Sequence, residues 1–285
     1  MKFSSVLLSC AILGAMGVGM VNAEDKEWSL VWSDEFEIDG APDSTVWSAE
    51  NGFTRNHELQ WYQAENAYCK NGLLVIEALP ANYPNPMYEE GSNDWRKSRK
   101  NVECTSTSIT TRGTKEFLYG RFEVKARIPV GSGAWPAIWL LGSEMPWPSC
   151  GEIDVMEFYR IKDVPHILAN AAWGKDKQWD AKWDGARVPF SHFLEKDSMW
   201  AEKFHIWRMD WNEEAIRIYL DDELINEILL SETNNGKIGD YSNPFKKPMY
   251  LLLNLAIGGD NGGTVDWDCF PMKYEIDYVR VYQQK

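Results

Sequence analysis

Hydrophobic side chains recur at every second position along most of this sequence. Residues 121–128 alternate charged and apolar side chains without interruption, and Ile216, Ile218 and Leu220 alternate with polar residues in the same way. A period of two indicates a β-strand with one buried face. No segment has a helical period that lasts three turns. The sequence therefore predicts an all-β fold built from many short strands.

Seven more segments fit strands, and turns rich in Gly, Pro, Asn and Asp separate them. They are residues 73–79, 105–111, 137–141, 152–159, 204–211, 250–256 and 274–282. So many strands without helices indicate a sandwich or jelly roll. A curved antiparallel sheet with an open concave face forms a groove for a long substrate. Residues 80–98 are polar and interrupted by proline, which predicts a long surface loop.

The N-terminus has the layout of a secretory signal peptide. A basic residue precedes an apolar run over residues 6–20, and Ala23 ends a short stretch of small residues that a signal peptidase reads. The run is too short to span a membrane, and no other stretch approaches the required length. We expect residues 1–23 to be cleaved after Ala23, and residues 24–285 to form one secreted or periplasmic domain.

The composition limits the possible partners. The net charge is −14, and like charge repels nucleic acids and strongly anionic polymers, so the charge suits a neutral partner. The chain holds 15 Trp and 12 Tyr, and because Trp is rarely buried completely, an exposed aromatic surface is expected. The apolar faces of sugar rings stack on such surfaces. We expect a monomer that binds a polysaccharide or glycan and no nucleic acid.

Four cysteines follow the predicted cleavage site, and their spacings do not suit a zinc site. They are Cys69, Cys104, Cys150 and Cys269. Export permits disulfides, and a bridge between Cys69 and Cys104 is one interpretation, since both lie near predicted strands that could be neighbours. Free buried thiols are the other interpretation.

Three carboxylates lie in a segment that otherwise has the pattern of a buried strand. Glu152, Asp154 and Glu157 are interspersed with Ile, Val, Met and Phe. On a regular strand Glu152 and Asp154 share a face, but Glu157 points into apolar packing, where a bare carboxylate is costly. A one-residue β-bulge at Val155-Met156 returns Glu157 to the first face. The other interpretations are a solvated acidic strand and a calcium site, although calcium usually draws its ligands from a loop.

Carboxylates in this arrangement suit the hydrolysis of a glycosidic bond. Glu152 and Glu157 lie roughly 13 Å apart along a bulged strand. If their side chains lean together, the carboxyl groups come to roughly 5–6 Å, the separation found in retaining rather than inverting glycosidases. Asp154 between them pushes their pKa values apart, as an acid and a nucleophile require. No cofactor is expected for this catalysis.

The segment around these carboxylates resembles the active-site motif of glycoside hydrolase family 16, in the bulged form of its laminarinase-like branch. Matches to the family run in order through nearly all of residues 24–285. They include 30–36 (LVWSDEF), 56–62 (NHELQWY), 119–123 (YGRFE), 135–142 (WPAIWLLG), 253–259 (LNLAIGG) and 277–282 (DYVRVY). The resemblance implies a β-jelly-roll sandwich of two curved antiparallel sheets with a concave cleft. It also implies endo-acting, retaining hydrolysis of β-linkages.

The same resemblance assigns roles to individual residues. It implies that Glu152 is the nucleophile, Glu157 the acid/base and Asp154 the supporting carboxylate. Trp135 and Trp139 are four apart on one strand face, so we expect them to form a sugar platform. Further candidate contacts with substrate are Asn56, Trp147, Trp173, Trp61 and Trp179.

The resemblance implies one metal site. Asp277 is similar to a family position that helps to hold a calcium ion, together with main-chain oxygens near Glu35. Such an ion is structural and takes no part in catalysis. The sequence alone equally describes Asp277 as an ordinary strand residue.

Two departures from the laminarinase pattern bear on the sugar. Ser108 stands where an Arg is usual, and residues 171–174 (AAWG) stand where a neighbouring strand usually carries a His. Both family positions face the cleft, and an indole at Trp173 offers stacking to galactose. Two substrates therefore remain open: β-1,3-glucan, or β-galactoside chains cut by an endo-β-1,4-galactosidase acting on poly-N-acetyllactosamine or mucin O-glycans. A transglycosylase and a lectin-like binding module are the alternatives to a hydrolase.

Overall fold

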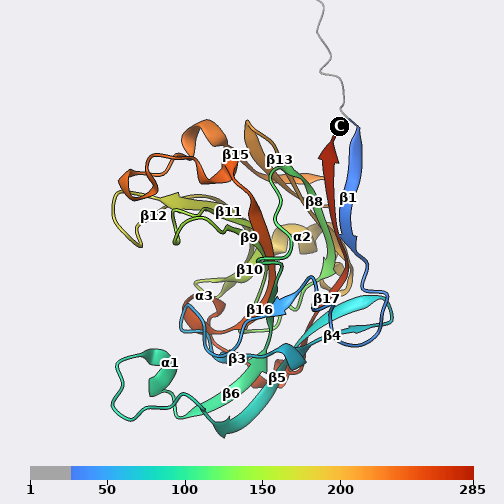
Figure 1. Ribbon diagram of the computed structural model, residues 1–285. Coiled ribbons are helices and arrows are strands. Elements are labelled where there is room, and N and C mark those ends of the chain that lie inside the picture. The colour runs from blue at the N-terminus through green and yellow to red at the C-terminus, as the bar shows by residue number, and fades with distance from the viewer. Residues whose placement is uncertain (1–26) are drawn as a thin grey trace, which may run out of the picture.

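Two β-sheets pack on each other in the computed structural model, which describes residues 27–285 (Figure 1). The predicted signal peptide, residues 1–23, lies outside the described residues. The predicted all-β sandwich is confirmed. Among the helices of residues 27–285, none has the length and apolar character needed to cross a membrane.

The larger sheet has ten strands, nearly all of them antiparallel. In order across the sheet they are β15 (Glu223–Leu229), β14 (Ala215–Leu220), β13 (His205–Trp211), β8 (Gly120–Arg127), β17 (Met272–Gln284), β5 (Leu73–Pro84), β6 (Asn101–Ser106) and β3 (Gln60–Tyr62). In addition, β1 (Trp28–Asp34) pairs with β17, and β4 (Ala67–Lys70) pairs with β5. The alternation predicted for residues 121–128 is confirmed along β8, where buried and half-buried side chains alternate.

The smaller sheet has seven strands and holds the carboxylate segment near its centre. In order they are β12 (Ala181–Pro189), β11 (Val164–Gly174), β10 (Glu152–Ile161), β9 (Ala134–Gly142), β16 (Met249–Ile257), β7 (Ser108–Thr110) and β2 (Ser48–Ala49). Because β10 has partners on both sides, its backbone is fixed by two ladders of hydrogen bonds. A strand held in this way is a rigid support for reactive side chains.

Helices are few and short in the described residues. The α-helices are α1 (Trp95–Ser98), α2 (Ser191–Lys196) and α3 (Gly259–Gly262). Short 3-10 helices span Ala64–Asn66, Trp200–Glu202, Leu230–Glu232, Lys237–Gly239, Pro244–Lys246 and Trp267–Cys269. The ribbon formed by β5 and β6 extends past the other strands, and α1 lies in the connection between these two strands (Figure 1). The surface loop predicted for residues 80–98 is therefore partly strand, because β5 continues to Pro84, and it ends in α1.

The main core lies between the two sheets. Phe122 and Trp211 of the larger sheet and Ile138 and Phe158 of the smaller sheet are each at most 2% exposed within it. The opposite face of the smaller sheet also carries buried apolar residues, since Trp139 and three neighbours form a second, smaller cluster there. The outer face of the smaller sheet thus carries buried apolar side chains beside its polar groups, which removes water from those groups.

The four cysteines in residues 27–285 are all free thiols. Cys69 lies opposite Leu74 on β5, whereas Cys104 lies opposite Pro80 and Gln60. The two residues therefore contact different parts of the larger sheet, and a Cys69–Cys104 bridge is wrong for this structure.

Candidate active site

Glu152, Asp154 and Glu157 all project from β10 into one cleft. The register of β10 against β11 shifts between Asp154 and Glu157, and its register against β9 shifts at the same place. This confirms the predicted β-bulge. The extra residue reverses the parity of the strand, so that Glu157 shares the face of the other two carboxylates.

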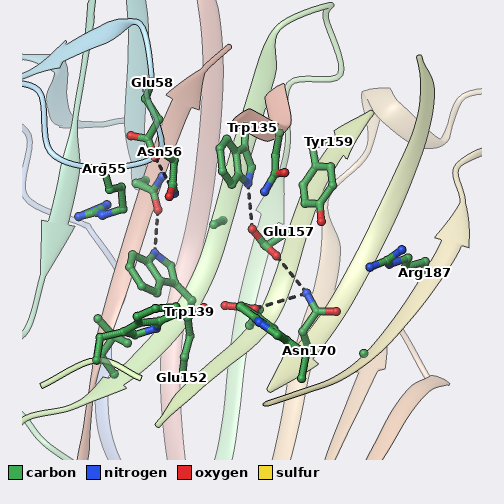
Figure 2. Close-up of a pocket in the computed structure, with 18 of the residues that line it drawn as sticks. Arg55, Asn56, Glu58, Trp135, Trp139, Glu152, Glu157, Tyr159, Asn170 and Arg187 are labelled. Carbon is green, nitrogen blue, oxygen red and sulfur yellow. Dashed lines mark hydrogen bonds between the residues drawn. The ribbon is translucent and has the colours of Figure 1, made fainter. Parts of the chain in front are cut away.

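The carboxylates are held by neutral N–H donors, and the structure gives them no ion pair with a cation. Trp147 Nε1 donates to Glu152 Oε2 at 2.9 Å. Trp135 Nε1 donates to Glu157 Oε1 at 2.9 Å (Figure 2). Asn170 Nδ2, from β11, donates to Glu157 Oε2 at 3.0 Å and to Asp154 Oδ2 at 3.3 Å. Neutral donors orient the three groups without cancelling their charge.

Burial raises the pKa of every member of the trio, and the charge of Glu157 raises it further for Glu152 and Asp154. The pKa of Glu152 rises to about 7, first because of burial and then because of the charge of Glu157. Burial likewise raises the pKa of Glu157 to about 7. The pKa of Asp154 is raised well above its ordinary value, because this side chain is buried and lies between the other two. Near neutral pH the trio therefore keeps part of the protons that isolated carboxyl groups would release.

The cleft has a volume of about 820 Å³, and aromatic side chains form much of its surface. Trp135 and Trp139 both line it from β9, as their spacing predicted. Trp139 Nε1 donates to Asn254 Oδ1 at 2.7 Å, and the Arg55 guanidinium lies 5.1 Å from the Trp139 ring centroid. Both contacts fix the orientation of this indole. A wall of this kind presents flat apolar faces beside polar groups, as sugar rings require.

Asn56 and Trp147 also line the cleft, in agreement with their assignment from sequence. Trp179, likewise named from sequence, stacks on Trp147 with a centroid distance of 6.3 Å and is 66% exposed. Trp183, from β12, is 53% exposed in the same wall. Trp61 packs edge-on against Phe53 and is not part of the lining.

The structure contradicts the assignment of Trp173 to the cleft. Trp173 is 6% exposed, belongs to the main core and packs edge-on against Phe245. The reason is the parity of β11: Asn170 and Ala172 face the cleft, so Trp173 points to the opposite side. The residue opposite Glu152 across the strand pair is Ala172. Ser108 is fully buried and lies opposite Asn254, so it contributes no exposed surface to the cleft.

Asp277 does not fit a calcium site. Its carboxylate pairs with Lys125 Nζ at 2.6 Å, and Glu35 pairs through both carboxylate oxygens with Arg280. Within residues 27–285 no three His, Cys, Asp or Glu side chains gather closely enough to share a metal ion. The charge that a calcium ion would balance is already balanced by a lysine.

Several lining residues carry no strong signal in the sequence. Tyr159 lies two positions beyond Glu157, so strand parity alone could have placed it in the cleft. Asn170 could not be found in this way, because its role depends on the register of β11 against β10. The remaining unpredicted lining residues include Arg55, Glu58, Arg96, Trp183, Arg187 and Asn254.

Gly185 gives Asn170 the space it occupies. It lies opposite Asn170 on β12, and a Cβ atom at this position would come within 2.4 Å of Asn170 Oδ1. Any larger residue would displace the amide that holds Asp154 and Glu157. A glycine in the middle of a strand is here explained by the close approach of a neighbouring side chain.

Comparison with known proteins connects this geometry to one family. The model of glycosyl hydrolases family 16 matches residues 44–280. A β-glucanase of Rhodothermus marinus is 35% identical, over 98% of this chain and 92% of the relative.

Solved structures agree with this match. One comes from a study of endo-acting O-glycanases that members of the human gut microbiota express to initiate mucin breakdown. It has a TM-score of 0.76 and 35% identity, over 90% of this chain and 91% of that chain. The laminarinase catalytic domain of Thermotoga maritima MSB8 has a TM-score of 0.73 and 33% identity, over 91% and 100% of the two chains.

Proposed function

The chain belongs to glycosyl hydrolase family 16, and within this family we propose that it cuts internal β-galactoside linkages of lactosamine-type chains, as found on mucin O-glycans. It is an endo-acting glycoside hydrolase.

The aromatic wall next to Glu152 carries the proposal for galactose. Ala172 leaves the position opposite Glu152 without a polar side chain, while Trp147, Trp179 and Trp183 line the cleft nearby. Galactose has a continuous apolar face, because its axial hydroxyl lies on the opposite side of the ring, and indoles stack on such a face. Similarity to the O-glycanase structure, with a TM-score of 0.76, supports the same substrate.

A β-1,3-glucan is the second candidate. The β-glucanase of Rhodothermus marinus and the laminarinase of Thermotoga maritima are both more than 30% identical to this chain over at least nine-tenths of its length. The volume of the cleft, about 820 Å³, gives room for more than one sugar ring in either case.

For the chemistry, we propose a double displacement. Glu157 donates its proton to the glycosidic oxygen while ionised Glu152 attacks the anomeric carbon, which forms a glycosyl ester and releases the first product. Glu157 then removes a proton from water, which attacks the ester from the opposite face and restores the β configuration. Asp154 keeps its proton and limits the negative charge of the trio. If an acceptor sugar replaced the water, the same steps would give transglycosylation.

Glu157→Gln tests the division of roles. Without its proton donor the enzyme should lose activity on a polymer by about 10²- to 10⁴-fold. Aryl glycosides with an activated leaving group need no proton, so the variant should keep much of its ability to form the glycosyl ester. Equal losses on both substrates would show that Glu157 is not the acid.

The substrate proposal is tested by initial rates on four polymers: poly-N-acetyllactosamine, laminarin, mixed-linkage glucan and agarose. We expect the first to be cut fastest and to give oligosaccharides at the earliest time point. Glu152→Gln, purified in parallel, controls for contaminating activity. Rapid cleavage of laminarin with no attack on the lactosamine chain would replace the galactoside proposal by the glucan one.

We also propose that the enzyme is exported from the cytoplasm. A signal peptide at residues 1–23 would deliver the domain outside the cytoplasm, where polymeric substrates are found. N-terminal sequencing of the mature protein from the producing cell tests this. A mature chain that starts at Glu24 is expected, and one that retains Met1 would contradict export by cleavage.

A further inference from the structure

Arg187 differs from every other arginine of this chain in its contacts. The chain has eleven arginines, all within the described residues 27–285. Nine of the others donate to carboxylates or backbone carbonyls: Arg55, Arg96, Arg99, Arg121, Arg127, Arg160, Arg208, Arg217 and Arg280. Arg112 lies over the ring of Tyr250. The guanidinium of Arg187 has no hydrogen bond, ion pair or ring contact with any residue in this range.

An unpaired guanidinium is unexpected in a chain with 43 acidic residues. The alternation along β12 explains why Arg187 meets none of them. Trp183, Gly185 and Arg187 occupy alternate positions that line the cleft, whereas Asp184, on the other face, receives a hydrogen bond from Asn226. The guanidinium of Arg187 therefore points into the substrate cleft, away from the carboxylate of Asp184.

The register of the sheet places Arg187 at the level of the acid/base. Glu157 lies opposite Leu168 on β11, and Leu168 lies opposite Arg187 on β12. Two strand spacings separate Glu157 from Arg187, roughly 10 Å. Figure 2 shows the guanidinium directed from β12 toward the space beside Asn170 and Tyr159. At this distance the guanidinium does not pair with the catalytic carboxylates. It lies where a sugar next to the bond that is cut would bind.

Tyr159 provides a second polar group on the same side. Its ring packs edge-on against Trp135 at 5.6 Å, and its hydroxyl has no hydrogen-bond partner among the described residues. Burial and the charge of Glu157 raise the pKa of this hydroxyl, and the charge of Arg187 opposes that rise. Arg187 and Tyr159 therefore form a pair of donors that the protein itself leaves unused.

We propose that Arg187 and Tyr159 form a subsite for an anionic substituent, a sulfate ester or a carboxylate, on a sugar next to the bond that is cut. This rests on the proposed function and narrows it to glycans that carry isolated negative charges. Arginine binds planar or tetrahedral anions through two parallel N–H donors, and a phenol adds a third. The net charge of −14 still repels a densely sulfated polymer at long range, so the subsite selects one charge at one position.

The test compares matched substrates that differ only in charge. The probes are a neutral poly-N-acetyllactosamine oligosaccharide, the same chain with 6-O-sulfate on N-acetylglucosamine, and the same chain capped with sialic acid. Arg187→Gln should lower kcat/KM on at least one charged chain by about tenfold, since hydrogen bonds to charged groups are the strong ones. The loss on that charged chain should clearly exceed any loss on the neutral chain, which brings no anion to Arg187. The sulfated and sialylated chains separate the two sources of negative charge.

Lys182 supplies the matched control. It is an exposed cation on β12, outside the cleft lining, so Lys182→Gln removes the same charge from the same strand. It should leave all three rates unchanged. Equal losses on neutral and charged chains in Arg187→Gln would overturn the proposal, because Arg187 would then bind sugar hydroxyls. No loss on either charged chain would overturn it as well.

Failure of the proposed function gives a different result. If the wild type cuts no lactosamine chain, the galactoside proposal fails, and the subsite is then tested by binding. Calorimetry with Glu152→Gln, with and without Arg187→Gln, measures affinity for a β-1,3-glucan tetrasaccharide and its monosulfated form. A gain in affinity from the sulfate that depends on Arg187 supports the subsite, and a gain that does not depend on Arg187 refutes it.

Discussion

Charged side chains have opposite surroundings on the two sheets. On the larger sheet, charges on neighbouring segments pair with their opposites. Arg121 binds Asp210 through two nitrogens at 2.6 and 2.8 Å, and Arg280 binds Glu35, just beyond β1, at 2.9 and 2.8 Å. These groups are partly exposed, so water shares in their solvation. Such pairs contribute modestly to stability.

On the smaller sheet, Glu152, Asp154 and Glu157 are gathered on one strand and receive hydrogen bonds only from neutral N–H groups. Their charges remain uncompensated, and their pKa values rise. The comparison shows that the same residue types contribute to stability or to reactivity, depending on whether a cation lies beside them. The hydrogen bonds from Arg280 lower the pKa of Glu35, whereas burial raises the pKa values of the cleft trio toward the range in which they exchange protons near neutral pH.

Removal of Glu152 should have the largest effect. Glu152→Gln keeps the shape of the side chain but cannot form the glycosyl ester, so we expect turnover of polymer to fall by about 10⁴-fold or more. Initial rates with sensitive detection of reducing ends measure this, and calorimetry should show that the variant still binds oligosaccharide. A variant that keeps a tenth of wild-type activity would exclude Glu152 as the nucleophile.

Removal of the amide that joins two of the carboxylates should have a smaller effect and a characteristic pH dependence. Asn170 donates to the ionised forms of Asp154 and Glu157 and so lowers their pKa values. In Asn170→Ala the pKa of Glu157 should rise beyond about 7. Because the acid must be protonated, the alkaline limb of the kcat profile should move to higher pH, and the maximum rate should fall about tenfold.

Asn226→Ala is the control for this variant. Asn226 donates to Ala169 O and Asp184, away from the three carboxylates, so its removal should leave the pH profile in place. An unshifted profile in Asn170→Ala would mean that this amide positions the carboxylates without affecting their protonation.

The uncompensated charge should also cost stability at high pH. Glu152 has a folded-state pKa of about 7 against an ordinary value of 4.5, so the folded state binds this proton more tightly than the unfolded state. The stabilisation of the folded state that comes from this tighter proton binding is complete below pH 4.5 and is lost as the pH rises through about 7. Glu152→Gln removes the penalty, so it should be more stable than the wild type at pH 8 by on the order of 2 kcal/mol, and by less at pH 5. Urea unfolding at both pH values measures this, and an equal difference at both would contradict the assignment.

The smallest effect is expected for a paired charge on the larger sheet. Lys125→Ala removes the partner of Asp277, and because both side chains are more than a third exposed, we expect a loss below about 1 kcal/mol and unchanged activity. A chelator should leave the thermal midpoint of the wild type unchanged, since Lys125 already balances Asp277. A fall of several degrees that added calcium reverses would show that Asp277 or its neighbours bind a metal ion.

Properties that repeat along one strand could be read from the sequence. Alternation predicted β8, and the cost of burying Glu157 among apolar residues predicted the bulge in β10. The spacing of Trp135 and Trp139 placed both in the cleft. In each case the physical reason is local, because side-chain direction alternates along a single strand and a buried charge constrains its own segment.

Properties that depend on which strands meet, and in what register, were decided only by the tertiary structure. The assignment of Trp173 to the cleft was wrong because the register of β11 against β10 decides which of its residues face the cleft. No local pattern reveals that register, and a shift of one residue moves every side chain of a strand to the opposite face of the sheet. The same pairing brings Asn170 to the carboxylates and Arg187 to the level of Glu157. The pairing of Asp277 with Lys125 likewise joins residues more than a hundred positions apart. The sequence therefore determined the sheets and the reactive strand, while contacts between strands determined the surroundings of each reactive group.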